Sequence, residues 1–385
     1  MLLTSRGRVQ LKQSITIAKV DVVPLRVRGG VSPKMALGTM PTRPALLVRV
    51  EDTSGCFGWG EVWANFPPRA NIHKAHLIED VVAQHLQGFS YTDPREVDAA
   101  LRDRLSVFFL HVGQVKVFEH ILAGIDTALW DLSLRSANVS FANFMNLPNS
   151  DARSYATSIN VEDLDLLIPR HADYGQTHFK LKIGFEEHGT ASILEHARNL
   201  CPDGARIMVD SNQSWSLEQA KTALEAIEEY DPFFAEESLR ADAPLSDWEM
   251  LANSTNIPLA GGENIYGIDS FLTVTRAGMK VLQPDVAKWG GVSGALDLAR
   301  VVPDDVLIWP HFMGTGIGQT AALSVSAAIG PSSACEVDVN DNPLRTELCS
   351  DDLNIRNGVI ALPQMAGLVT PPCPQSLVEF SEKEF

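Results

Sequence analysis

The sequence lacks any long apolar segment. No run reaches the roughly 18 apolar residues that a membrane-spanning helix needs, and the first residues, MLLTSRGRVQLKQS, are too polar for a signal peptide. We therefore expect no membrane partner. Residues 1–14 are predicted to form a loose N-terminal tail.

Cysteine and basic residues are also scarce. The five cysteines are an odd number, lie far apart and form no CxxC motif, which is typical of reduced thiols in a cytoplasmic protein. Lys and Arg total 31 against 48 Asp and Glu, so the net charge is −17. This charge argues against a nucleic-acid partner. It does not argue against an anionic substrate, because local cations set the field at a site.

Three acids at nearly equal steps are present instead. Asp210, Glu236 and Glu263 end the short apolar runs RIMVDSN, FFAEES and PLAGGEN. The steps are 26 (236 − 210) and 27 (263 − 236) residues, which is the length of one strand, one helix and two loops. The ends of successive strands meet at one rim of a parallel barrel, and oxygen donors without His or Cys suit Mg²⁺ better than Zn²⁺. The spacing predicts a Mg²⁺-dependent enzyme, with Mn²⁺ as the substitute ion.

The same step continues in both directions and gives eight candidate strands. Seven of them end in a chargeable or metal-binding side chain, which is useful at an open rim but costly inside a core. Besides the three acids, these are Lys180 and Lys182 in HFKLKIG, Asp285 in QPDVA, His311 in IWPHF and Glu336 in SACEVDV, and the eighth strand is SYATSIN. The segments between the strands have apolar residues at helical spacing. This alternation predicts an α/β fold with a parallel barrel over residues 151–354.

Residues 15–150 differ from the barrel segment. Alternating strands such as ITIAKVDVVPLRV and PALLVRVED come first, and a helical pattern follows. We expect an α+β domain here, to which the C-terminal residues 355–385 return. The Gly- and Pro-rich stretch within residues 28–41 is predicted to be a loop that could act as a lid.

Six motifs in order give a resemblance to a known family. They are FKLKIG, MVDSN, FAEES, GGEN, QPDVAKWGG and PHF, and the weaker matches GWGE and AGIDTALWDL extend the resemblance toward the N-terminus. The chain resembles the enolase superfamily, mandelate racemase-like subgroup. The resemblance implies a modified (β/α)7β TIM barrel under an α+β capping domain. It also implies a Mg²⁺-assisted removal of the proton α to a carboxylate of a small molecule, through an enediolate, in a homo-oligomer of two to eight subunits.

The resemblance also assigns roles around the metal. Asp210, Glu236 and Glu263 are implied as metal ligands, and strand alternation places the neighbouring Glu237 on the opposite side. Lys180 and Lys182 point to one face of a strand, where two nearby ammonium groups and burial lower the pKa of each. Lys182 is thereby expected to be the base, with Lys180 nearer the substrate carboxylate.

A second set of roles concerns the other side of the substrate. Asp285 and His311 resemble the acid–base pair of the subgroup, since an Asp fixes the imidazole tautomer and raises its basicity. Glu336 is implied as a protonated hydrogen-bond donor to the substrate carboxylate, and Asn212 as a substrate contact. Structural alternatives are a buried His, a solvated loop acid for Glu336 and a turn residue for Asn212. Lys288 is a rival second base, which the resemblance makes a supporting residue.

Several overall reactions follow from one shared first step. Dehydration of an acid sugar ranks first. The stretch PHFMGTGIGQTAALSVSAAI followed by CEVDVNDNPLR is similar to galactarolactone cycloisomerases, which makes sugar-lactone cycloisomerisation the second alternative. Racemisation or epimerisation of an α-substituted carboxylate is the third. A non-catalytic barrel that binds a metal and a ligand is the remote alternative.

Overall fold

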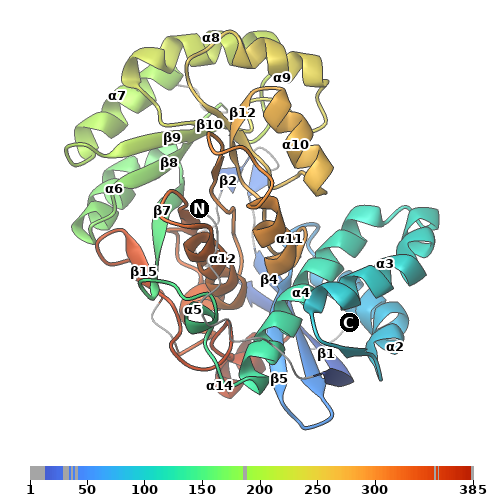
Figure 1. Cartoon of the computed structure of the whole chain (residues 1–385). Coiled ribbons are helices and arrows are strands. Elements are labelled where there is room, and N and C mark those ends of the chain that lie inside the picture. The colour runs from blue at the N-terminus through green and yellow to red at the C-terminus, as the bar shows by residue number, and fades with distance from the viewer. Residues whose placement is uncertain are drawn as a thin grey trace.

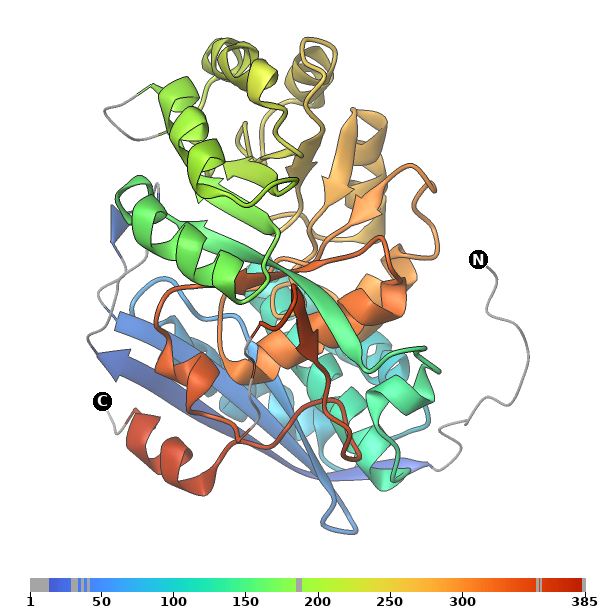
Figure 2. The ribbon, with the colours of Figure 1, turned by 90° about the vertical axis from the view of Figure 1, so that its left-hand side faces the viewer.

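Two sheets organise the chain. The computed structural model describes residues 14–28, 34–35, 38–39, 42–184, 189–350, 353 and 355–382. We call residues 15–150 the cap; it contains an antiparallel sheet, and a curled parallel sheet with outer helices follows it (Figures 1 and 2). The predicted tail, apart from residue 14, and most of the loop at 28–41 lie outside the described residues.

The cap sheet has the strand order β5-β4-β1-β6. Its strands are β1 (Ile15–Arg28), β4 (Thr42–Asp52), β5 (Phe57–Val62) and β6 (Ser90–Tyr91), and a separate small hairpin joins β2 (Lys34–Met35) to β3 (Gly38–Thr39). The helices are α1 (Ala70–Leu77), α2 (Ala83–Leu86), α3 (Pro94–His111), α4 (Val115–Ser136) and α5 (Phe141–Phe144), with a π-helical turn at Ile78–Val82. None of the helices in the described ranges has the length and apolarity to cross a membrane.

In the described part of the barrel, eight parallel strands alternate with seven helices, which confirms the predicted (β/α)7β order. The strands are β7 (Asp151–Ile159), β8 (His178–Lys182), β9 (Arg206–Asp210), β10 (Ala235–Glu236), β11 (Leu259–Gly261), β12 (Met279–Leu282), β13 (Leu307–Ile308) and β14 (Cys335–Asp338). The helices between them are α6 (Leu164–Asp173), α7 (Thr190–Leu200), α8 (Leu217–Ile227), α9 (Leu245–Ala252), α10 (Ile268–Arg276), α11 (Gly291–Leu298) and α12 (Gly316–Ile329).

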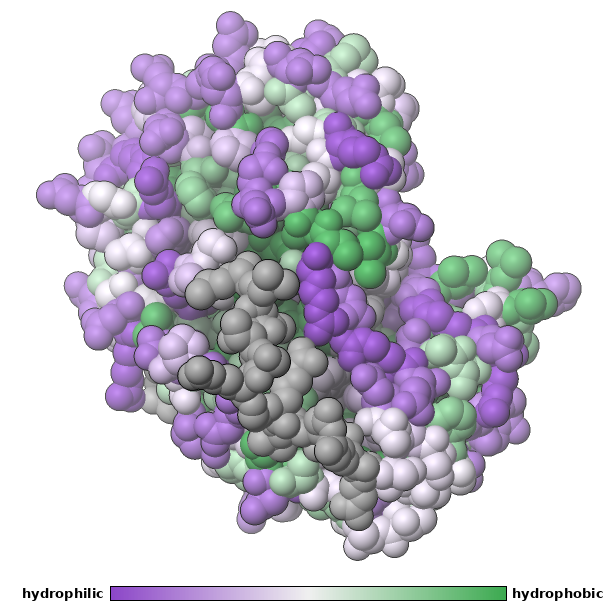
Figure 3. All heavy atoms as spheres, viewed as in Figure 1, coloured by the Kyte–Doolittle hydropathy of each residue, from purple (hydrophilic) through white to green (hydrophobic). Residues whose placement is uncertain are grey.

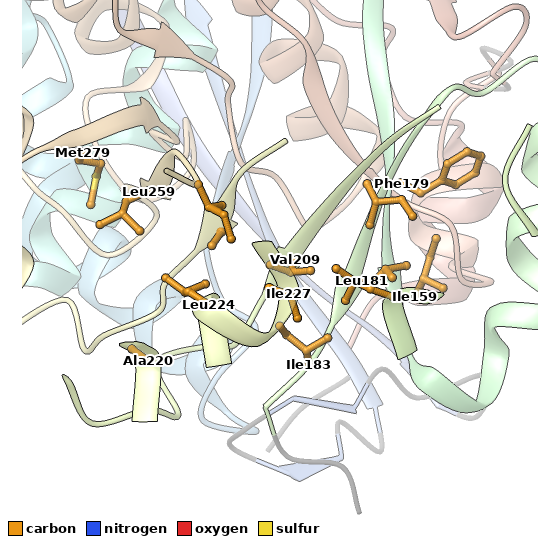
Figure 4. Close-up of a cluster of buried hydrophobic side chains, with 14 of the residues drawn as sticks. Ile159, Phe179, Leu181, Ile183, Val209, Ala220, Leu224, Ile227, Leu259 and Met279 are labelled. Carbon is orange, nitrogen blue, oxygen red and sulfur yellow. The ribbon is translucent and has the colours of Figure 1, made fainter. Parts of the chain in front are cut away.

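The strand order is β13-β12-β11-β10-β9-β8-β7-β14, with parallel pairing throughout. The Glu336 N–H donates to Pro310 O at 3.1 Å, which links β14 to the chain just after β13. The apolar runs of the sequence form the core between strands and outer helices, where Leu181 and Val209 of the sheet pack with Leu224 of α8 (Figure 4).

The C-terminal segment departs in part from the prediction. After α13 (Pro343–Thr346), the strand β15 (Val359–Ala361) pairs with β7 of the barrel and not with the cap sheet. The cap is reached before α14 (Pro374–Phe380), where the Leu368 and Val369 N–H groups donate to Asp131 Oδ1 of α4 at 2.7 and 3.2 Å. Beyond α14, Ser381 bridges Leu25 of β1 and Glu382 lies 2.7 Å from Arg26. Three apolar residues cannot indicate which sheet edge they join, so the partner strand was not readable from sequence.

Buried carboxylates join the cap to the barrel. Glu61 of β5 accepts hydrogen bonds from Thr315 N, Thr315 Oγ1 and Gly318 N at the start of α12, at 2.6–3.1 Å. Asp126 of α4 accepts from Ser293 N of α11 at 2.9 Å. Helices α11 and α12 lie between the barrel and the cap (Figure 1). The first turn of a helix has unpaired N–H groups, and the cap supplies acceptors for them.

Close backbone contact explains why GWGE and AGIDTALWDL occur together. A Cβ atom on Gly60 of β5 would lie 2.0 Å from Gly124 O of α4, and one on Gly58 would lie 2.2 Å from Ala128 O. Only glycine therefore lets α4 pack directly on β5. This packing holds Glu61 against α12.

The stability of the cap–barrel junction should depend on pH through Glu61. Burial raises the pKa of Glu61 to about 7, although the hydrogen bonds from Thr315 and Gly318 lower it. The folded protein thus holds this proton more tightly than the unfolded chain. The contribution of Glu61 to the free energy of unfolding is complete below about pH 4.5 and is lost as the pH rises through about 7, by up to about 3 kcal/mol.

We predict that Glu61→Gln removes this part of the pH dependence. Urea unfolding at pH 5 and pH 7.5 should show a wild-type free energy of unfolding that falls, relative to the variant, at the higher pH. The same pH dependence in both proteins would contradict the assignment.

Candidate active site

Strand pairing places the first predicted site residues side by side. Lys182 is aligned with Asp210, and Asp210 with Glu236, across the neighbouring strands β8, β9 and β10. All three side chains are almost completely buried. The expectation that these strand ends meet at one rim is confirmed.

Lys180, on the same face of β8, is buried beside this group and is 1% exposed. Its Nζ is 2.6 Å from Glu236 Oε2 and 2.9 Å from Glu336 Oε1. Gln283 Nε2 donates to the same Glu236 oxygen at 2.5 Å. Burial lowers the pKa of Lys180, but Glu236 and Glu336 outweigh it and raise the pKa well above its ordinary value.

Lys182 lies higher and is also paired with an acid. Its Nζ is 2.6 Å from Asp210 Oδ2 and donates to Asn212 Oδ1 at 2.9 Å. Burial lowers the pKa of Lys182, but Asp210 raises it, and the net shift is upward. The predicted lowering is wrong for this arrangement, because the argument from sequence counted burial and Lys180 but not the adjoining carboxylate.

Glu237 differs from the prediction that placed it away from the site. Its φ of 43° breaks the strand alternation directly after β10. Its carboxylate accepts from Gln213 Nε2 at 3.1 Å and from Asn264 Nδ2 at 2.8 Å. Burial, followed by the charges of Glu263 and Asp210, raises its pKa well above the ordinary value. Glu237 therefore belongs to the same cluster of acids.

The opposite wall carries the predicted Asp–His pair. His311 Nδ1 is 2.8 Å from Asp285 Oδ2, and His311 Nε2 is 3.2 Å from Glu263 Oε2. Burial lowers the pKa of His311, but Glu263, Glu336 and Asp285 raise it to about 9. The predicted Asp285–His311 contact and the raised basicity are confirmed. Glu263 also lies 2.8 Å from Lys288 Nζ, and its pKa, raised by burial, is brought well below the ordinary value by Lys288 and His311.

Glu336 has a lowered pKa, in contrast to the protonated donor that was expected. Burial raises its pKa, but Lys180 at 2.9 Å and His311 outweigh burial and lower the pKa below its ordinary value. The two cations come from strands that are distant in sequence, so their effect could not be anticipated. Glu336 Oε2 accepts no hydrogen bond from the described residues and is 3.6 Å from His311 Nε2.

A cavity of about 450 Å³ opens onto the rim. Four predicted site residues lie on its wall, namely Lys182, Asn212, Glu263 and His311. Five others are buried beside the wall residues, namely Lys180, Asp210, Glu236, Asp285 and Glu336. The barrel also contributes Gln213, Glu237, Arg240, Asn264, Lys288 and Met313 to the wall. The cap contributes Trp63, Asn65 and Phe66.

Five of these nine wall residues lie within four residues after a predicted acid, namely Gln213, Glu237, Arg240, Asn264 and Lys288. Gln213 comes after the Asp210 strand and Asn264 after Glu263, so their positions in SNQ and GGEN were the available signal. The loop WANFPPRA after Glu61 was the sequence signal for Trp63 and Asn65 as substrate contacts, against a solvated surface, and both line the cavity together with Phe66. Asn212 donates its backbone N–H to Asp210 Oδ1 at 2.8 Å with φ 45°, so it is both a turn residue and a wall residue.

The donor set fits a divalent cation. Within the described residues, no three His, Cys, Asp or Glu side chains already lie as a group that could hold a metal ion, because the predicted ligands face Lys180, Lys182, Lys288 and His311. However, six carboxylates surround these four cationic groups: Asp210, Glu236, Glu237, Glu263, Asp285 and Glu336. Acidic groups therefore outnumber cationic groups in this cluster even when His311 is protonated. A hard dication with oxygen ligands matches this excess.

The fold and the site together define a barrel enzyme with acid–base groups at the carboxyl ends of its strands. Comparison with known proteins gives the family. The model of the enolase C-terminal domain-like family matches residues 167–374, and the model of the mandelate racemase/muconate lactonizing enzyme N-terminal domain matches residues 17–145. The chain belongs to the mandelate racemase/muconate lactonizing enzyme family of the enolase superfamily.

Individual relatives cover nearly the whole chain. A solved mandelate racemase/muconate lactonizing enzyme from Bordetella bronchiseptica RB50 is 36% identical, with a TM-score of 0.87 over 95% of this chain and 99% of that one. The D-galactarolactone cycloisomerase of Agrobacterium fabrum (strain C58) is 27% identical over 88% of this chain and 91% of its own. The arabinonate dehydratase of Saccharolobus solfataricus is 26% identical over 83% and 86%. The relatives are lyases and isomerases, and the chain is an enzyme of this superfamily.

Proposed function

We propose that the protein is a Mg²⁺-dependent acid-sugar dehydratase, in which Lys182 and His311 act on opposite sides of the substrate. The observation that carries the proposal is that both groups line the same cavity, Lys182 from β8 and His311 from the segment after β13. These strands are separated by two strands in one direction around the barrel and by four in the other, so the two groups face each other.

The remaining wall residues suit a polyhydroxy carboxylate. The side-chain amides of Asn65, Asn212, Gln213 and Asn264 offer donors and acceptors for several hydroxyl groups. Arabinonate and galactonate dehydratases among the relatives act on substrates of this kind. The amide-rich wall favours an acid sugar over an apolar carboxylate.

The metal site we propose consists of Asp210, Glu236 and Glu263. A Mg²⁺ ion on these carboxylates would stabilise the negative charge that develops on the substrate carboxylate. It would also neutralise the charge of Asp210, which raises the pKa of Lys182. Lys182 would then remove the α proton, because burial and Lys180 both disfavour its charged form. His311, oriented by Asp285, donates a proton to the leaving β-hydroxyl, which is a poor leaving group without it.

Sugar-lactone cycloisomerisation is the second candidate. It is favoured by the match to the D-galactarolactone cycloisomerase over 88% of this chain. In that reaction an internal carboxylate leaves, and a carboxylate needs little help from an acid. Racemisation would use the same two groups to exchange a proton on opposite faces.

The metal prediction compares two adjacent glutamates. Glu236→Gln should weaken Mg²⁺ binding, measured by calorimetry, by more than the roughly 10–100-fold typical of losing a supporting group. Glu237→Gln, the matched control, should weaken it less. Chelation should abolish turnover, and Mg²⁺ or Mn²⁺ should restore it. A larger loss of Mg²⁺ affinity in Glu237→Gln would reassign the ligand to Glu237.

The reaction prediction uses acid sugars and their lactones in D₂O, followed by NMR. Lys182→Ala should lower turnover by about 10²–10⁴-fold, while Lys280→Ala, at an exposed barrel lysine, should leave it unchanged. His311→Asn should abolish dehydration but should spare much of a cycloisomerisation that uses Lys182 as its base. Wild-type turnover in both Lys182→Ala and His311→Asn would exclude the two-base scheme. A protein that binds Mg²⁺ but exchanges no α-proton would favour the non-catalytic alternative.

We also propose that the enzyme is cytoplasmic and homo-oligomeric. All five cysteines lie in the described part of the chain and are thiols, which supports a cytoplasmic location.

Exposed apolar residues support the oligomer. Five apolar side chains at the α3–α4 turn are 41–78% exposed, namely Val107, Phe108, Leu110, Val112 and Val115. The turn lies on an arm that projects from the body in Figure 1, and the space-filling view in Figure 3 shows hydrophobic residues on this arm. Residues 102–119 carry a net charge of +1, from three basic and two acidic residues, against −17 for the chain, so a second acidic copy can approach here without repulsion.

The oligomer prediction replaces apolar residues on this arm. Val107→Glu with Leu110→Glu should reduce the mass measured by light scattering. Leu245→Glu with Met250→Glu, at exposed positions of α9, should not. A wild-type protein that is monomeric at high concentration would refute the assignment.

A further inference from the structure

A buried polar chain connects the cap to the rim outside the proposed catalytic groups. Lys74 of α1 donates through Nζ to Trp63 O and contacts His120 Nδ1 of α4 at 2.8 Å. His120 Nε2 is 2.9 Å from the Tyr266 hydroxyl. Tyr266 lies in the loop between β11 and α10, three residues after Glu263. The chain therefore runs from the cap to the loop of a proposed metal ligand.

The protonation pattern of the chain follows from its contacts. When Lys74 is protonated, its ammonium group can only donate, so His120 Nδ1 accepts and the proton of the neutral imidazole lies on Nε2. His120 Nε2 then donates to the Tyr266 oxygen. Burial, together with Lys74 and Lys288, lowers the pKa of His120 well below its ordinary value, which agrees with a neutral ring.

The backbone N–H and the carbonyl of Trp63 are both hydrogen-bonded. Its N–H donates to Ala287 O at 3.1 Å, in the loop that carries Asp285 and Lys288, and its carbonyl accepts from Lys74. Lys74 Nζ and Lys288 Nζ lie 4.7 and 4.8 Å from the indole ring, within the range of cation–π attraction. The ring itself lines the substrate cavity.

Burial of Lys74 is expected to lower the stability of the fold. It is 3% exposed, and its contacts within the described residues are a carbonyl, an imidazole and an indole ring, with no carboxylate. Burial and the charge of Lys288 disfavour its charged form and lower its pKa to about 7. A buried cation without an acid usually costs stability, so its place in the chain points to a role at the site.

We propose that Lys74, His120 and Tyr266 are positioning residues, which act as one unit to hold Trp63 and the Glu263 loop against the substrate. The inference rests on the proposed function for its substrate, but not for its geometry. Losing one buried hydrogen bond should loosen both loops and weaken substrate binding by about two- to tenfold. The effect should fall on KM more than on kcat, since none of the three side chains contacts the proposed base or acid.

The first measurement is hydrogen–deuterium exchange without substrate. Tyr266→Phe removes only the hydroxyl, and Lys74→Met removes only the amine. Each should speed exchange in peptides that cover residues 57–66 and 262–267. Tyr174→Phe, at an exposed tyrosine on the barrel, is the matched control. Unchanged exchange in both test variants would overturn the proposal, whatever substrate the enzyme uses.

The second measurement is a double-mutant cycle on KM, with any carboxylate that the wild type turns over. Lys74 and Tyr266 each contact His120, so the combined variant should be no worse than the stronger single variant. Additive increases in KM would refute the proposal that the three residues act as one unit. Faster exchange with an unchanged KM would refute it as well. Because exchange needs no substrate, failure of every acid sugar would count against the proposed reaction and not against the chain.

Discussion

The structure depends on carboxylates that are buried against the first turns of helices. Glu61 and Asp126 of the cap receive backbone N–H groups of α12 and α11, the two helices that lie against the cap. Removal of such an acceptor would leave several buried donors unpaired, which costs more than the hydrogen bonds contribute. Trp63 is only two residues beyond Glu61, so the same contact that attaches the cap also fixes the cavity wall.

The rim is a network of ion pairs in which charged groups contact more than one group of the opposite charge. Lys180 lies between Glu236 and Glu336, and Glu263 lies between Lys288 and His311. The pKa of each group is set by burial and by its neighbours acting in opposite directions. A substitution at one position must therefore change the protonation of residues on other strands, and single-residue effects here will not add.

Much of this arrangement was readable from the sequence, because strands buried on both faces are apolar except at their ends. The regular step between polar strand ends identified eight strands and aligned Lys182, Asp210 and Glu236 correctly. Glu237 was misplaced because one left-handed residue reverses the alternation. The upward pKa shift of Lys182 was missed because the argument from sequence left out Asp210 on the neighbouring strand. The downward pKa shift of Glu336 was missed because its contacts with Lys180 and His311 have no local signal. The pairing of β15 had no distinguishing pattern at all.

The contact between the two ends of the chain has a consequence for synthesis. Leu25 of strand β1 bridges Ser381, and Arg26 pairs with Glu382, 356 residues later in the sequence. The ribosome makes these partners long after it has made β1. The first strand of the cap therefore stays without these contacts while the barrel between them is synthesised.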